Sequence, residues 1–297
     1  MPVPRSYSFC TCDVFTDRRF GGNQLAVVLE ADELSTDQMQ AIAREFNYSE
    51  TVFVLPPSDP AHSARARIFT PARELRFAGH PTIGTAFVLA TWRPSLASAD
   101  RIVLEEGVGP VSISVERDGT QIRRCVFAAP TLPQQGPRTP PRDTLAAMLG
   151  LAPLEVLDSA EFWSCGMGFL VVPVASVAAL ERCRLDIAVW AGALAAYESK
   201  HVYPVAQAGD AWRVRMFAPD AGVAEDPATG SAAAAFAGWL AHYAPQAARR
   251  SRYTLLQGQE IGRPSRLDVT IDRDGERVTQ VLVGGTSVMV SQGMLLA

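Results

Sequence analysis

The second half of the chain repeats sequence blocks of the first half in the same order. The segment Arg65–Pro71 (RARIFTP) aligns with Arg213–Pro219 (RVRMFAP), 148 residues further on, and four of the seven positions are identical. A few residues later, His80–Ala86 (HPTIGTA) matches Asp226–Ala232 (DPATGSA) at an offset of 146 residues. An offset of about half the chain length is what an internal duplication predicts.

Duplication has one alternative, which is chance similarity between stretches rich in alanine, arginine and glycine. Chance does not account for the shared order, the shared spacing and the common Pro-x-x-Gly-[Ser/Thr]-Ala pattern. We therefore expect an N-terminal repeat domain over residues 1–130 and a C-terminal repeat domain over residues 131–297, with the tail after about residue 280 packing back on the first domain. The proline-rich segment Thr131–Arg142 is the expected linker.

Each half is predicted to combine short strands with a few helices, which gives an α+β chain. Alternating or continuous apolar runs predict strands in the first half at the following ranges: Tyr7–Phe15, Leu25–Leu29, Val52–Leu55, Ala64–Phe69, Ile102–Glu105, Val111–Glu116 and Ile122–Phe127. Ser35 with Gln38 forms a capping-box pattern that predicts a helix over Gln38–Phe46, and Pro81 is expected to open a second helix through Ala90. In the second half we expect helices over Ala188–Glu198 and Thr229–His242, and strands from Leu267 to Leu296 with a turn at 272–275.

Composition excludes several classes of protein. The 297 residues carry 27 basic and 31 acidic side chains, a net charge of −4, and 48% are hydrophobic, which is typical of a globular chain without a nucleic-acid partner. Lys200 is the only lysine and follows no glycine run, so a GxxxxGK[ST] phosphate loop is excluded and a pyridoxal phosphate site is disfavoured.

The cysteines and histidines indicate neither disulfides nor a metal. The five cysteines are scattered and form no CxxC pair, and the four histidines show no HExxH spacing. No apolar run reaches 18 residues, so no membrane partner is expected. We expect reduced thiols, no metal site and a cytoplasmic location.

The repeated blocks predict two anion-binding helix starts. His80 and Asp226 are expected at the helix N-caps with proline at the first helical position, followed by Gly84-Thr85 and Gly230-Ser231. Helix N-termini present N–H groups without intrahelical partners, and glycine lets a ligand approach them. Taken alone, either block is explained better by ordinary capping and packing, but their pairing favours a site for a small carboxylate.

Glu50 is a candidate general base. It lies where the helix that ends at Phe46 gives way to the apolar strand Val52–Leu55. Partial desolvation there would raise the pKa of the carboxyl group and allow proton exchange near neutral pH. A solvated surface glutamate is the common alternative, and only a family resemblance outweighs it.

The chain resembles the phenazine-biosynthesis PhzF-like isomerase family. The blocks that carry the resemblance span residues 13 to 265: Asp13–Val27, Asn47–Phe53, Phe77–Ala86, Glu225–Ala232 and Gln257–Ser265. The resemblance implies a diaminopimelate-epimerase-like fold, in which two pseudo-symmetric domains each wrap a curved, mostly antiparallel sheet around a central helix, with the active site between them.

The resemblance also implies the roles of individual residues. Glu50 is implied as the proton-transfer residue, and His80 and Asp226 as catalytic partners. The implied substrate-binding residues are Asn23, Ser49, Gly79, Thr85, Gly230 and Ser231. Related epimerases use two opposed cysteines, which these blocks lack, so two-cysteine epimerisation is not supported. The resemblance implies a homodimer, and it implies no metal or other cofactor.

The leading hypothesis is a cofactor-independent isomerase that acts on a small carboxylate-bearing substrate. Glu50 removes a proton from one carbon and returns it to another carbon of the same π-system. Two alternatives stay open. One is a racemase or epimerase that uses Glu50 and Asp226, and the other is a non-catalytic protein that binds a small molecule.

Overall fold

The computed structural model describes residues 5–243 and 248–297, and these residues form two compact units. Unit 1 comprises the chain up to residue 128 together with residues 284–297, and unit 2 comprises residues 129–283. The last strand, β17 (Ser287–Leu296), belongs to unit 1 because it pairs antiparallel with β1 (Ser6–Val14) along its whole length.

Unit 1 is built mainly of strands. Its elements after β1 are β2 (Asn23–Val28), α1 (Thr36–Phe46), β3 (Glu50–Leu55), β4 (Ala64–Phe69), β5 (Glu74–Leu75), α2 (Gly79–Trp92), η1 (Pro94–Leu96), β6 (Arg101–Glu106), β7 (Gly109–Asp118) and β8 (Gln121–Ala128). The pairing is antiparallel between β1 and β2, parallel between β2 and β3, antiparallel between β3 and β4, and parallel between β4 and β6. The pairings β4–β5, β6–β7 and β7–β8 are also antiparallel.

Unit 2 has the same order of pairings. Its elements are β9 (Gln134–Gln135), α3 (Arg142–Leu149), η2 (Pro153–Glu155), β10 (Glu161–Ser164), β11 (Gly168–Pro173), α4 (Val177–Arg182), α5 (Ile187–Ala193), β12 (Val202–Ala208), β13 (Ala211–Val214), η3 (Pro219–Ala221), α6 (Gly230–Tyr243), β14 (Arg250–Gln257), η4 (Gln259–Ile261), β15 (Ser265–Asp274) and β16 (Arg277–Gly285). From β10 to β15 the pairings run antiparallel, parallel, antiparallel, parallel and antiparallel, as they do from β1 to β7. Both units therefore follow one plan.

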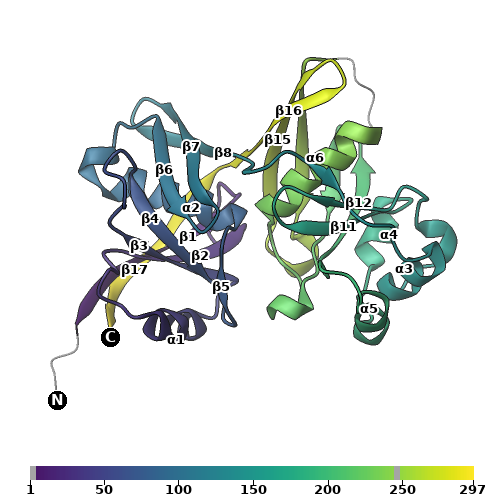
Figure 1. Cartoon of the computed structure of the whole chain (residues 1–297), viewed down its shortest axis with the longest axis horizontal. Helices are drawn as coiled ribbons and strands as arrows, with labels where there is room; N and C mark the ends of the chain where they lie inside the picture. The colour runs from purple at the N-terminus through teal and green to yellow at the C-terminus, as the bar shows by residue number, and fades with distance from the viewer. Residues whose placement is uncertain (1–4, 244–247) are drawn as a thin grey trace. The chain divides into compact units, whose positions relative to one another are not determined.

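Each unit has one helix that is buried along most of its length. In unit 1, residues Gly79–Ala90 of α2 are buried, and α2 contacts strands β1, β2, β3, β6, β7, β8 and β17. In unit 2, residues Gly230–Ala241 of α6 are buried, and α6 contacts β9, β10, β11 and β15. A helix that is apolar on all sides is stable only when it is enclosed, and Figure 1 shows the sheet of each unit curving around its helix.

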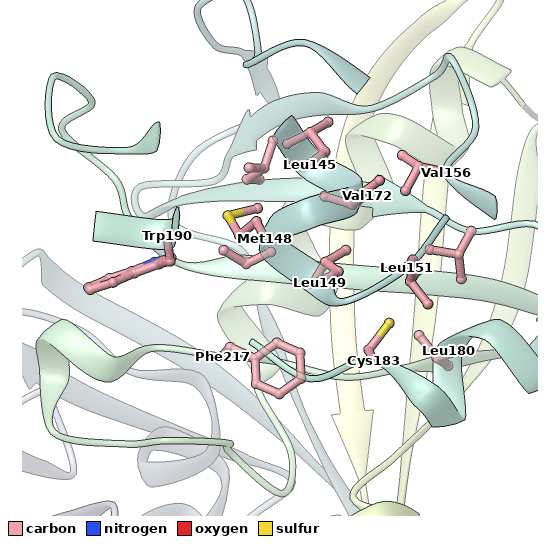
Figure 2. Close-up of a cluster of buried hydrophobic side chains, with 14 of the residues drawn as sticks. Leu145, Met148, Leu149, Leu151, Val156, Val172, Leu180, Cys183, Trp190 and Phe217 are labelled. Carbon is pink, nitrogen blue, oxygen red and sulfur yellow. The ribbon is translucent and has the colours of Figure 1, made fainter. Parts of the chain in front are cut away.

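Shorter helices cover the opposite face of each sheet. In unit 1, α1 packs Met39 and Ile42 against Phe53 and Leu55 of β3. In unit 2, α3, α4 and α5 share a larger apolar cluster with β11 and β12, which Figure 2 shows around Met148, Leu149 and Val172. Because both faces of β11 are buried, its sequence is continuously apolar rather than alternating.

Most of the predicted elements are observed, but the predicted helix caps are wrong. His80 is the second residue of α2, since the helix begins at Gly79 after an Ala78 cap, and Pro81 lies third. No backbone N–H group in the first turn of a helix has an intrahelical acceptor, so proline, which lacks this group, is tolerated at any position of that turn. Pro81 therefore does not define where α2 begins. Asp226 lies four residues before α6 begins at Gly230, because its carboxyl group accepts a hydrogen bond from Thr229 in the preceding turn.

The helix predicted over Ala188–Glu198 is also shorter than expected. Asp186 accepts hydrogen bonds from the N–H groups of Ala188 and Val189, which starts α5 at Ile187, and the helix ends at Ala193. Two further helices, α3 and α4, were not predicted from the sequence. The prolines before α3 indicated a linker, although Pro141 in the structure is the cap residue of that helix.

Candidate active site

Parallel pairing brings two predicted site residues of unit 1 to one edge of the sheet. Asn23 is the first residue of β2 and Glu50 is the first residue of β3. The two strands pair in parallel with Leu25 opposite Glu50, so both strands begin at the same edge. Asn47 ends α1 in the left-handed conformation at φ 52°, and this sharp turn delivers the chain to Glu50 within three residues.

His80 joins these residues from the first turn of α2. Its imidazole Nδ1 lies 3.1 Å from the Asn23 side-chain Nδ2, and its Nε2 lies 3.3 Å from the Gln24 carbonyl oxygen. The same Nε2 is 3.4 Å from Oε2 of Glu50, whose side chain is only 15% exposed. The structure therefore brings Asn23, Glu50 and His80 together, although up to 57 residues separate them in sequence.

The surroundings of His80 define its protonation state. Burial lowers the pKa of the imidazole from 6.5 to about 3, and the hydrogen bond to Gln24 only partly opposes this shift, so His80 is neutral at pH 7. The Gln24 carbonyl can only accept, which places the single ring proton on Nε2. Nδ1 is then an acceptor for the Asn23 amide. Oε2 of Glu50 lies 3.4 Å from this same protonated nitrogen.

Glycine is required just before Asn23. Gly22 has φ +62°, and a Cβ atom there would lie 2.3 Å from the Val14 carbonyl oxygen. In the same loop, the Phe20 N–H donates a 2.6 Å hydrogen bond to the buried carboxyl group of Asp13 in β1. These contacts hold the loop that delivers Asn23 to His80.

The remaining predicted substrate-binding residues of unit 1 lie next to Glu50 in the sequence or in the helix that carries His80. Ser49 directly precedes β3 and Gly79 is the first residue of α2. Thr85 is fully buried in α2, and within the described parts of the chain its hydroxyl oxygen has no hydrogen-bond partner. Roles for these three residues in substrate binding stay predictions.

In unit 2, Asp226 is held in a turn before α6. Thr229 donates its hydroxyl proton to Oδ2 of Asp226 at 2.5 Å, and the backbone N–H of Asp226 donates to the Met216 carbonyl at 2.9 Å. Burial and the nearby Asp226 carboxyl together raise the pKa of Tyr203. Gly230 and Ser231 form the first turn of α6, where backbone N–H groups have no intrahelical acceptor.

Gln257 fixes this turn, although no role was predicted for it from the sequence. Its amide nitrogen donates to the Asp226 carbonyl at 2.8 Å and to Thr229 Oγ1 at 3.1 Å, while its amide oxygen accepts from the Thr229 N–H at 3.2 Å. The next residue, Gly258, has φ +79°, and a Cβ atom there would lie 2.7 Å from the Pro227 carbonyl oxygen. The block that begins at Gln257 was noticed in the sequence, but a contact across 31 residues has no local signal.

Thiol chemistry is disfavoured by the surroundings of the cysteines. All five are free and buried. Burial raises the pKa of Cys10 to about 11 and the pKa values of Cys125, Cys165 and Cys183 to about 12, and it raises the pKa of Cys12 further. Such thiols are poor bases at neutral pH.

The described residues contain neither a cluster of metal ligands nor a membrane-spanning helix. Between residues 5 and 243 and from 248 onward, no three His, Cys, Asp or Glu side chains lie close enough together to hold a metal ion. None of the helices in these ranges combines the length and the apolar character needed to cross a membrane.

Comparison with known proteins identifies relatives along nearly the whole chain. The model of the family described as phenazine biosynthesis-like proteins matches residues 12–293. An isomerase of uncharacterised function from Mesorhizobium japonicum is 43% identical, covering 95% of this chain and 96% of its own. The trans-2,3-dihydro-3-hydroxyanthranilate isomerase of Pseudomonas aeruginosa is 38% identical, covering 97% of this chain and 98% of its own.

The fold is likewise shared with a solved structure. The crystal structure of a PhzF-family phenazine biosynthesis protein from Bacillus anthracis superimposes with a TM-score of 0.88 at 27% sequence identity, covering 99% of this chain and 100% of the other. The predicted α+β fold, with a curved sheet around a central helix in each half, is confirmed.

Proposed function

The chain belongs to the phenazine biosynthesis-like PhzF family of isomerases, and from this premise we propose that Glu50 moves a proton between two carbons of a small carboxylate-bearing substrate without a cofactor. The Glu50 carboxylate would take the proton from one carbon and return it, as a carboxylic acid, to another carbon on the same face. A single carboxyl group can serve both steps when both carbons lie within hydrogen-bonding reach.

The observation that carries this proposal is the 3.4 Å approach of His80 Nε2 to Oε2 of Glu50. Since His80 is neutral, it is a hydrogen-bond donor rather than a competing acid. It would orient the Glu50 carboxyl group and stabilise its charged form before the first proton transfer and after the second. Asn23 would keep the ring proton on Nε2 by donating to Nδ1.

The remaining residues are proposed to hold the substrate. Asp226 and Ser231 would bind polar groups, and Gly79 and Gly230 would offer backbone N–H groups to a carboxylate at the helix starts. Ser49 and Thr85 are proposed as further contacts. The resemblance also favours a homodimer, which light scattering of the purified protein would test, and a cytoplasmic location.

The first substrate to test is trans-2,3-dihydro-3-hydroxyanthranilate, for which the Pseudomonas aeruginosa relative is named. We would incubate it with the protein in D₂O and follow deuterium incorporation and double-bond position by NMR. Glu50→Gln should lower the rate about 1000-fold, since general acid–base catalysis contributes roughly 10²–10⁴-fold. Glu45→Gln, an identical change at an exposed position of α1, is the matched control and should leave the rate unchanged.

Three outcomes would contradict the proposal. Full activity of Glu50→Gln would remove Glu50 from the chemistry. Inversion at one carbon without migration of a double bond would make the protein an epimerase. Saturable binding of the substrate, with no turnover and no deuterium exchange, would make it a binding protein.

A further inference from the structure

A buried carboxyl group lies against the first turn of α2, outside the set of residues used above. Glu106 ends β6, is 8% exposed, and has its Oε1 atom 2.7 Å from the hydroxyl of Thr82, which is fully buried. The other carboxyl oxygen, Oε2, is shielded from solvent and has no hydrogen-bond partner within residues 5–243 and 248–297. A buried polar group of this kind needs a physical explanation.

The hydrogen bonds around Thr82 indicate a protonated carboxyl group, in which the buried Oε2 is a neutral carbonyl oxygen rather than a charged one and is therefore less costly to bury. The Thr82 hydroxyl oxygen lies 2.8 Å from the Ala78 carbonyl oxygen as well as 2.7 Å from Glu106. The hydroxyl has one proton, and both a carbonyl and a carboxylate can only accept. With an ionised Glu106, one of the two short contacts would lack a proton. A protonated Glu106 donates to Thr82, which then donates to Ala78, and both contacts are satisfied.

This chain of hydrogen bonds closes the turn that carries His80. Ala78 is the cap residue of α2, and its carbonyl also accepts from the Thr82 N–H at 3.2 Å. His80 lies between these two residues, and its imidazole reaches Glu50. The geometry of the turn is therefore coupled to the protonation of Glu106.

We propose that Glu106 is a positioning residue that is held in its protonated form, and that its ionisation at alkaline pH displaces the first turn of α2 and with it the His80 imidazole. The consequence for catalysis rests on the proposed role of His80, whereas the protonation of Glu106 and the displacement of the turn do not.

The charged groups around Glu106 do not explain why its carboxyl group is protonated. α2 contributes only His80, which is neutral, and the paired end of β7 over Gly109–Val111 carries no charge. The nearby charged residues beside β6 are Arg65, Arg67, Glu74, Arg76 and Glu105. Arg67 pairs with Glu74 at 2.7 Å, and Arg76 donates to the Gly107 carbonyl. Burial raises the pKa of Glu106 to about 8, and only the Thr82 hydrogen bond opposes this shift.

The direct test is a pH titration followed by NMR, without any substrate. We would label glutamate at the side-chain carboxyl carbon with ¹³C and the histidine rings with ¹⁵N, and titrate from pH 5 to pH 10. We expect one carboxyl resonance to titrate with a midpoint near 8, and the His80 ring nitrogens to shift with the same midpoint. In Glu106→Gln, whose amide still donates to Thr82, both transitions should be absent.

Glu105→Gln is the matched control. Backbone N–H groups of Asp59 and Ser58 and the His62 side chain lower the pKa of Glu105 to about 2, so this variant should keep both alkaline transitions. Titration of Glu106 near its ordinary value of 4.5 would overturn the proposal. A His80 resonance that stays constant between pH 7 and pH 9 would overturn it as well.

Stability gives a second readout that needs no resonance assignment. Between pH 4.5 and about 8 the unfolded chain ionises this carboxyl group while the folded chain keeps it protonated, so stability falls as pH rises. The folding equilibrium constant of the wild type should therefore fall up to about tenfold per pH unit relative to Glu106→Gln. A constant ratio across this range would overturn the proposal. If no variant turns over the test substrate, the proposed function fails while both of these measurements still decide the state of Glu106.

Discussion

The two units share the same order of strand pairings around a central helix, but they place different polar side chains at the start of that helix. In unit 1, His80 lies inside the first turn of α2, and its neutral ring is held by Asn23 and the Gln24 carbonyl. In unit 2, Asp226 lies before α6 and its carboxyl group accepts from Thr229. The repeated scaffold thus presents a hydrogen-bond donor in one copy and an acceptor in the other. The order of strand pairings is therefore the same in the two units, whereas the side chains at the helix starts differ.

The largest expected loss of stability comes from breaking the turn of unit 2. Gln257→Leu removes three hydrogen bonds and leaves the polar groups of Asp226 and Thr229 buried without them. Each unsatisfied buried group costs about 1–3 kcal/mol, so we expect a loss of about 3 kcal/mol in the free energy of unfolding, measured with urea. Gln207→Leu, at an exposed position of the same unit, is the control and should cost less than about 0.5 kcal/mol. Equal losses in the two variants would contradict the role given to Gln257.

The next effect tests the donor in unit 1. His80→Gln removes the fixed Nε2–H group near Glu50, and we expect the rate of isomerisation to fall about 100-fold, which corresponds to about 2.7 kcal/mol. His62→Gln is the same substitution at a histidine that contacts Glu105 instead, and it should keep the wild-type rate. Deuterium exchange in D₂O would measure both. A His80→Gln rate within twofold of the wild type would show that Glu50 works without this donor.

Acid pH should distinguish His80 from an ordinary histidine. The unfolded chain binds a proton at this position below about pH 6.5, whereas the folded chain excludes it down to about pH 3. The unfolded state therefore binds more protons in this range, and stability should fall as pH decreases, by up to about 1.4 kcal/mol per pH unit. Unfolding of the wild type and His80→Gln between pH 6.5 and 4.5 would measure the difference. Parallel curves, or a ¹⁵N shift of His80 near pH 6.5, would contradict a buried neutral ring.

The comparison also shows where sequence reasoning succeeds. The central helices were predicted because a long apolar segment that begins with proline and glycine is typical of a buried helix. The repeated blocks predicted that both halves would share a plan, and the matching order of strand pairings agrees with this. The caps were placed wrongly because proline is compatible with any position of a first turn, and because Asp226 bonds to Thr229 rather than to the helix.

The site itself was much less accessible to sequence reasoning. Thirty residues separate Glu50 from His80, and it is the parallel pairing of β2 with β3 and the position of α2 that bring them within 3.4 Å. Local pattern alone would have treated Glu50 as a surface residue, and only the family resemblance selected it. Gln257 and Glu106 act through contacts between distant segments, so neither has a signature in the residues beside it.

The smallest expected effect concerns the start of α1, a helix whose first turn carries no predicted site residue. Ser35 caps α1 by accepting from the Gln38 N–H, and the Ser35 N–H donates to the side-chain oxygen of Gln38, whereas the cap residue of α2 has no side-chain hydrogen bond. A surface helix therefore depends on its cap, while burial stabilises α2. Ser35→Ala should lower the free energy of unfolding by about 1 kcal/mol and leave the rate of isomerisation unchanged. Ser95→Ala, at an exposed position outside any helix cap, is the control and should change neither. A loss of activity in Ser35→Ala would show that α1 and the turn leading to Glu50 are coupled more tightly than their contacts indicate.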